Sequence, residues 1–138
     1  MINLQKVKLA GCMALLAGVV NVAYADVVVV VSAKSTTTTM TADEISQIYL
    51  GKSKAMKPME TSGSPMRSQF YSKVAGKDEA QVKAIWSKLV FTGKATAPKE
   101  LASSADVVKA VAADPNAIGY VDKAAVDSSV KIVYAVPQ

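Results

Sequence analysis

The sequence predicts an α/β domain in which helices flank a mixed, partly parallel sheet. Five consecutive valines at positions 27–31 indicate a strand buried on both faces, because a half-exposed strand alternates apolar and polar residues. Apolar residues at helical spacing follow possible helix starts near residues 41, 64, 78 and 103. Such helices interspersed with short β-branched segments favour a sheet that is covered by helices.

The first 25 residues have the features of an export signal. Lys6 and Lys8 precede an apolar run over residues 9–20, and Ala23-Tyr24-Ala25 fits the small-x-small pattern of a cleavage site. The run is too short to span a bilayer. We therefore expect cleavage near Ala25, periplasmic or secreted localisation, and a single domain over residues 26–138.

Cys12 offers an alternative form of processing. Leu9-Ala10-Gly11-Cys12 resembles a lipoprotein box, which would leave Cys12 acylated and membrane-anchored. Most of the apolar segment follows Cys12, whereas a lipoprotein signal places it before the cysteine. This position favours soluble export over a lipid anchor.

Composition excludes several classes of function. The 113 residues after residue 25 contain neither histidine nor cysteine, which removes disulfides, thiol nucleophiles, histidine-dependent catalysis and the usual zinc sites. Removal of two lysines lowers the net charge from +5 to +3, and the remaining basic residues are scattered. We expect no enzyme activity, no cofactor, no metal and no nucleic-acid partner.

The first helix is predicted after a polar loop at residues 32–39. Thr41 and Glu44 match a capping box, Ile45, Ile48 and Tyr49 share helical spacing, and Gly51 is placed to end the helix. Adjacent acids such as Asp43 and Glu44 do not face one another on a helix. They are therefore interpreted as first-turn residues that suit the helix dipole, not as a catalytic pair.

A short strand at residues 57–60 and a turn of hydroxyl residues precede the second predicted helix. Ser64 is a good N-cap and Pro65 suits the first helical position. Phe70, Tyr71 and Val74 follow, and Gly76 is placed to end the helix.

Arg67 conflicts with a purely structural interpretation of this helix. It falls in the first turn, where the positive end of the helix dipole disfavours a cation, so a nearby anion would resolve the conflict. Backbone NH groups, the hydroxyls of Ser62 and Ser64, the close approach that Gly63 allows, and a guanidinium together predict an oxyanion site. The alternative is an ordinary capped helix whose arginine lies in solvent.

The second half of the chain predicts two more helices and two more strands. Asp78 caps a helix whose apolar face carries Val82, Ile85, Trp86, Leu89 and Val90, so Trp86 is expected in the core. Residues 92–99 are predicted as a surface loop. A helix from Ser103 or Ser104 to residue 113, strands at 117–121 and 130–136, and a helical turn between these strands complete the prediction.

Four stretches in order give the chain a resemblance to periplasmic phosphate-binding proteins of ABC transporters. They are residues 45–52, the Ser62-Gly63-Ser64 turn with Arg67 and Phe70, Trp86 with Phe91-Thr92-Gly93, and residues 115–121. The resemblance is to the short, single-domain relatives of that family. It implies one lobe of the type II periplasmic-binding-protein-like fold, with a mixed, mostly parallel sheet flanked by helices.

The resemblance also implies ligand roles for particular residues. In the family, hydroxyls, backbone NH groups and an arginine at this turn bind phosphate, and these roles fall on Ser62, Gly63, Ser64 and Arg67. Alignment on Arg67 instead places residues 64–66 against the family's Ser-Gly-Thr, so two registers remain open. Ser35 and Thr36 are further candidates, if the polar loop lies beside the site, and a solvated loop is the alternative.

A single lobe implies an incomplete site, because two-lobed members enclose their ligand between lobes. A second copy of the chain, a membrane permease or another envelope protein would have to supply the missing contacts. The leading hypothesis is a non-catalytic domain that binds phosphate or a similar oxyanion. The second is an envelope protein-interaction module that retains the scaffold without ligand binding. No Ser-Lys pair forms a recognisable catalytic motif.

Overall fold

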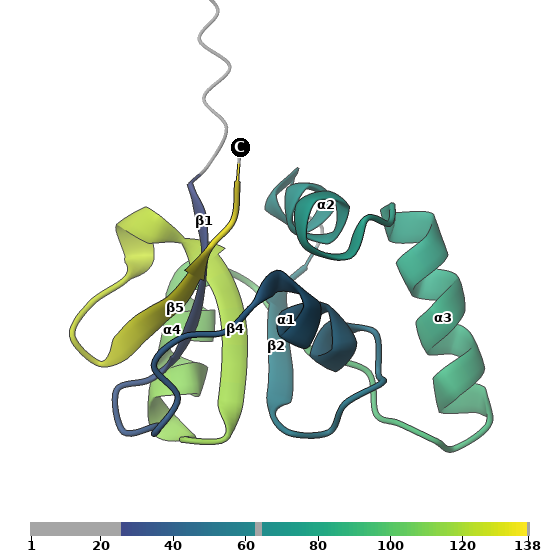
Figure 1. Cartoon of the computed structure of the whole chain (residues 1–138), viewed down its shortest axis with the longest axis horizontal. Coiled ribbons are helices and arrows are strands. Elements are labelled where there is room, and N and C mark those ends of the chain that lie inside the picture. Colours follow the sequence, from purple (N-terminus) through teal and green to yellow (C-terminus); the bar gives the residue numbers. More distant parts are fainter. Residues whose placement is uncertain (1–25, 63–64, 138) are drawn as a thin grey trace, which may run out of the picture.

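The computed structural model describes residues 26–62 and 65–137, in which helices cover both faces of one sheet (Figure 1). Its strands are β1 (Val27–Ser32), β2 (Lys57–Thr61), β3 (Lys99–Leu101), β4 (Ala117–Asp122) and β5 (Val130–Ala135). Its helices are α1 (Ala42–Tyr49), α2 (Pro65–Phe70), the π-helical η1 (Tyr71–Ala75), α3 (Glu79–Phe91), α4 (Ser104–Ala113) and the short 3-10 helix η2 (Lys123–Ala125).

The sheet has the strand order β3-β2-β4-β1-β5. β2 pairs in parallel with β3 and β4, whereas β1 pairs antiparallel with β4 and β5. Of the strands described, β1 alone therefore runs against the other four. The prediction of a mixed, mostly parallel sheet flanked by helices is confirmed.

The valine run forms β1, which is buried on both faces as predicted. Val27, Val29 and Val31 pack into a core shared with α1, α2 and α3, while Val28 and Val30 face the core beneath α4. No side chain from Val27 to Val31 is more than 3% exposed. Helices on both sides of the strand therefore explain why it shows no alternation of apolar and polar residues.

The helix boundaries follow the capping signals in the sequence. Thr41 and Glu44 form both hydrogen bonds of a capping box at the start of α1. Asp78 and Gln81 form a second complete capping box at the start of α3. Ser103 accepts from the backbone NH of Asp106 at the start of α4. Gly76 adopts a φ of 65° directly after η1, a left-handed conformation in which side chains are strained.

Two elements differ from the sequence prediction. The helix that begins at Pro65 changes to π-helical geometry at Tyr71. Its wider turns allow the adjacent residues Phe70 and Tyr71 both to reach the core, where neither is exposed. Residues Lys99–Leu101 form β3, although the predicted loop included Lys99 and no strand was predicted here. Three residues carry no periodicity, and their pairing depends on β2.

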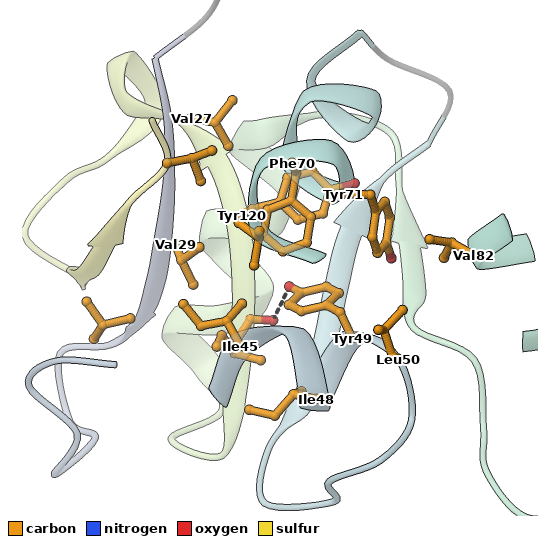
Figure 2. Packing of buried hydrophobic residues seen from close by; sticks show 14 of the residues in the cluster. Val27, Val29, Ile45, Ile48, Tyr49, Leu50, Phe70, Tyr71, Val82 and Tyr120 are labelled. Atoms are coloured by element: carbon orange, nitrogen blue, oxygen red, sulfur yellow. Dashed lines mark hydrogen bonds between the residues drawn. The ribbon is translucent and has the colours of Figure 1, made fainter. Parts of the chain in front are cut away.

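Four aromatic rings fill the core between the sheet and helices α1 and α2 (Figure 2). Phe70 stacks on Tyr120 with ring centroids 4.1 Å apart, and Tyr49 meets Phe70 edge-on at 4.7 Å. The buried hydroxyl of Tyr49 donates to the carbonyl of Met59 at 2.8 Å, so its polar group is satisfied. This cluster fixes the position of α2 above the end of β2.

Helix α3 contacts the rest of the domain through a narrow face. Val82 and Trp86 are buried, and the Trp86 indole Nε1 donates to the carbonyl of Tyr49 at 2.7 Å, which confirms Trp86 as a core residue. Val90 was expected on the same apolar face but is 51% exposed, and Phe91 is 91% exposed. Within the described residues, no helix has the length and apolar character needed to cross a membrane.

Candidate functional site

In sequence, the predicted anion turn falls between the end of β2 and the start of α2, and α2 lies in the upper part of the view in Figure 1. Pro65 is the first residue of α2, as the sequence predicts, and Arg67 follows within the first turn. Ser62 is exposed, and its backbone NH donates to the carbonyl of Leu101 in β3 at 3.0 Å. Gly63 and Ser64 lie outside the described residues, so their predicted roles stay predictions.

Arg67 lies between two carboxylates of its own chain. Its Nη1 donates to Oε1 of Glu100 at 2.8 Å, and its Nη2 lies 3.1 Å from Oε1 of Glu60. The arginine side chain is 22% exposed. The negative charge that the sequence argument requires beside Arg67 is therefore supplied within the chain, and the helix dipole gives no independent reason for an external anion.

Glu60 is the buried member of this cluster, with a side chain that is 2% exposed at the end of β2. Its Oε2 accepts hydrogen bonds from the hydroxyls of Tyr71 at 2.8 Å and Tyr120 at 3.4 Å, while Oε1 faces Arg67. Both oxygens thus have partners, as a buried carboxylate requires. We call Glu60, Arg67, Tyr71, Tyr120 and Glu100 the Arg67 cluster.

Burial decides how the Arg67 cluster titrates. Burial raises the pKa of Glu60 above its ordinary value near 4.5, and the hydrogen bond from Tyr71 and the charge of Arg67 offset only part of this rise. Burial, followed by the negative charge of Glu60, also raises the pKa values of Tyr71 and Tyr120. The two tyrosines therefore remain neutral donors at physiological pH.

Replacing Glu60 with glutamine should change how stability depends on pH. The pKa of Glu60 is higher in the folded protein than in the unfolded chain, where it is near 4.5, so folding favours the protonated side chain. The stability that this preference contributes is fully present below pH 4.5 and is lost as pH rises through the pKa of the folded state. We expect Glu60→Gln to gain stability relative to wild type as pH rises from 4 to 8. Urea unfolding at several pH values measures this difference, and a difference independent of pH would contradict it.

The structure does not bring Ser35 and Thr36 to the anion turn. They follow β1, which is antiparallel to β4, whereas β2 is parallel to β4. The carboxyl ends of β1 and β2 therefore lie at opposite ends of the sheet (Figure 1). The hydroxyl of Ser35 accepts from the backbone NH of Thr37, as in a polar turn. The condition under which Ser35 and Thr36 were candidates, that their loop lies beside Arg67, is not met, because the first strand is the one that runs in the reverse direction.

A groove of about 620 Å³ opens beside the Arg67 cluster. Its polar side carries Glu60, Arg67 and Glu100, and its apolar side carries Val82, Trp86, Val90, Phe91 and Pro98. The Arg67 Nε is buried and has no hydrogen-bond partner among the described residues. The groove therefore gives a ligand access to the guanidinium and to the exposed side of Glu100.

The sequence analysis missed four members of the Arg67 cluster. Glu60 gave a signal, since an acidic residue is unusual at the end of a buried strand. Tyr71 and Tyr120 were recognised only as apolar residues, and Glu100, directly after the predicted loop, was assigned to no element. No group of three or more histidine, cysteine, aspartate or glutamate side chains in the described part of the chain is placed to hold a metal ion.

The chain matches no protein-family model and no curated protein, but it does match solved structures. A Clostridium perfringens protein assigned to phosphate ABC transport and solved with bound phosphate aligns with a TM-score of 0.63 at 20% identity, over 79% of this chain and 44% of that one. An ABC-type phosphate transport receptor from Vibrio cholerae gives 0.61 at 17%, over 79% and 45%. PstS from Borrelia burgdorferi gives 0.60 at 13%, over 80% and 47%.

These likenesses agree with the resemblance found in the sequence. At such low identities they establish the fold, and function depends on the site. The chain spans less than half the length of each of these proteins. Its structural neighbours are substrate-binding proteins of phosphate ABC transporters, and the chain has the periplasmic-binding-protein-like α/β fold of those proteins.

Proposed function

We propose that this chain is an exported, non-catalytic domain that binds an oxyanion, with phosphate as the first candidate, at the start of α2. The observation that supports this proposal best is the contact between Arg67 and Glu100. There, Nη1 holds a carboxylate oxygen at 2.8 Å, and that carboxylate comes from a side chain that is 51% exposed. In this proposal an oxyanion from solution takes the place of the Glu100 carboxylate.

Glu100 is suited to such an exchange. It lies in β3, a strand of three residues at the edge of the sheet, and an exposed ion pair contributes little to stability. A guanidinium can donate to two oxygens of a phosphate at once. Glu100 offers Arg67 only one oxygen, so a phosphate could form more hydrogen bonds with Arg67 than Glu100 does. Ser62 would add its hydroxyl alone, because its backbone NH already donates to the carbonyl of Leu101. Gly63 and Ser64 would add their backbone NH groups and the Ser64 hydroxyl. Ser35 and Thr36 follow the opposite end of the sheet and do not contribute.

Glu60 sets the conditions for binding, because its buried negative charge remains beside Arg67 when Glu100 moves away. An anion would meet repulsion from Glu60 while this carboxylate is ionised. Burial raises the pKa of Glu60, so on acidification this carboxylate is protonated, and the repulsion removed, at a higher pH than for an exposed glutamate. The proposal therefore requires tighter oxyanion binding at lower pH.

Calorimetric titration of wild type and Glu100→Gln tests the proposal. We expect Glu100→Gln to bind phosphate about tenfold more tightly than wild type, since truncating one close charge pair changes affinity by this order or more. Binding should strengthen from pH 8 to pH 5. Sulfate should show the same trend, and since its charge stays constant over this range, the trend would report titration of the protein.

Glu79→Gln is the matched control, because Glu79 is an exposed acid in the first turn of α3. It removes the same charge and should leave anion affinity unchanged. If wild type and Glu100→Gln give no heat and no thermal shift with phosphate or sulfate at pH 5, the oxyanion proposal fails, because a bound ligand must stabilise the folded state.

The second candidate is an envelope protein-interaction module in which Arg67 stays paired with Glu60 and Glu100 and binds no anion. Two observations favour it: Arg67 already has two carboxylate partners, and Val90 and Phe91 are exposed beside the groove. The partner would be a membrane permease, another envelope protein or a second copy. A photoreactive amino acid at Phe91, but not at the exposed Lys73, should then crosslink one defined protein in the native envelope, and equal labelling from both positions would contradict this candidate.

A further inference from the structure

A second cavity, of about 690 Å³, shares Trp86 and Ala97 with the groove at Arg67 but is otherwise lined by different residues. The segments after α1 and after α3 line it together with the start of β2, at the lower end of the view in Figure 1. Its apolar surface includes Ile48, Met56, Met59 and Trp86. A volume of this size suits a small organic ligand.

Four lysines surround this apolar surface: Lys54, Lys57, Lys94 and Lys99. No carboxylate lines the cavity among the described residues, and only Lys57 has a partner within 4.0 Å, the carboxylate of Asp114 at 3.3 Å. The positive potential at this cavity is therefore not balanced by its own lining. Aliphatic stems of lysine can cover apolar surface while the ammonium groups stay in water.

Helix dipoles do not account for all four lysines. Lys54 and Lys94 follow the carboxyl ends of α1 and α3, where a cation is favourable for structural reasons alone. Lys57 and Lys99 instead begin strands β2 and β3, which provide no comparable dipole. Lys57 is accounted for by its ion pair with Asp114, whereas Lys99 has neither a helix end nor a carboxylate within 4.0 Å among the described residues, and all four cations line one apolar cavity.

We propose that this cavity binds an amphipathic anion, namely an alkyl chain that carries a carboxylate or phosphate head. The chain lies against Met56, Met59 and Trp86, and its burial supplies a hydrophobic contribution. The head lies among the lysine ammonium groups, which act as mobile point charges. A free fatty acid and an anionic membrane lipid share this chemistry.

Trp86 provides a direct probe, because it is the single tryptophan of the chain and it lines the cavity. Titration with monomeric dodecanoate should change its fluorescence saturably. Acetate has the head without the chain, and dodecyltrimethylammonium has the chain with the opposite charge, so neither should reproduce the saturable change. No response to dodecanoate, or an equal response to the cationic amphiphile, would overturn the proposal.

A pair of triple variants tests the role of the lysines. Lys54→Gln with Lys94→Gln and Lys99→Gln should weaken dodecanoate binding about tenfold or more, as expected when several close charges are lost. The control replaces Lys73, Lys109 and Lys123, which are equally exposed and lie outside the cavity lining, with the same net charge change. Equal weakening in both triple variants would show only general electrostatic attraction and would overturn the proposal.

Two further measurements locate the site and the source of the ligand. Phe91→Ser changes the groove at Arg67 but not this cavity, so dodecanoate affinity should be unchanged, and a large loss would assign binding to the groove instead. Anionic and neutral vesicles form the membrane arm. If dodecanoate binds and the protein also binds anionic but not neutral vesicles, the ligand is a membrane lipid. If dodecanoate binds and the protein binds neither kind of vesicle, the ligand is a free carboxylate. Vesicle binding without dodecanoate binding overturns the proposal.

Discussion

Arg67→Ala is expected to lower the free energy of unfolding by about 3 kcal/mol at neutral pH, because removing one partner of a buried ion pair leaves the other charge uncompensated. The charge left behind is Glu60, whose side chain is 2% exposed and which would keep only the two tyrosine hydroxyls. Urea unfolding followed by circular dichroism measures the loss. An arginine that served ligand binding alone would show no such effect in the absence of ligand.

The size of this loss should depend on pH in a defined direction. Burial raises the pKa of Glu60, so acidification neutralises the uncompensated carboxylate and the cost of Arg67→Ala should decrease towards pH 4. Lys83→Ala is the control, since Lys83 is an exposed cation that lines the same groove. It should change stability by less than about 0.5 kcal/mol. A loss of equal size in both variants would contradict the buried pair between Arg67 and Glu60.

Trp86→Ala is expected to destabilise the domain by about 4 kcal/mol, the middle of the range for removing a large buried aromatic side chain. Trp86 and Val82 are the buried residues of α3, so the substitution removes the larger of the two side chains that this helix buries in the core. It also leaves the Tyr49 carbonyl without the Nε1 donor that lies 2.7 Å away. Chemical unfolding gives the change in stability.

Two other variants separate the contributions of Trp86. Trp86→Phe keeps much of the apolar volume but removes the indole donor. It should therefore lower the free energy of unfolding less than Trp86→Ala does, and the difference between the two variants measures the contribution of packing. Val90→Ala on the same helix should change stability by less than about 0.5 kcal/mol, because Val90 is 51% exposed. If Trp86→Ala were as mild as Val90→Ala, α3 would have to be held by contacts other than those of Trp86.

The fold was predictable where its cause is local or periodic. Capping residues at Thr41, Asp78 and Ser103 set the starts of three helices, because each satisfies backbone NH groups within its own segment. The valine run predicted burial on both faces without knowledge of what covers it. Its reversed direction was not predictable, because direction depends on pairing with strands some 90 or more residues away along the chain.

The site was only partly predictable, because its decisive contacts join distant residues. The sequence identified Arg67 as a cation that needed a nearby negative charge, and the structure contains such charges. It did not indicate that Glu60 and Glu100 supply them, since β3 has no sequence signal and Glu100 meets Arg67 only when β3 pairs with β2. A local electrostatic conflict therefore indicates that a partner is needed, without identifying it.

The position of β1 has a consequence for the order in which this domain can fold. Its two neighbours, β4 and β5, follow it far along the chain, so β1 cannot enter the sheet until both of those strands have been synthesised. Until then the valine segment has no native strand to pair with, and an unpaired apolar β-strand readily associates with other chains. Pairing with β4 and β5 therefore removes an aggregation-prone edge as well as completing the sheet.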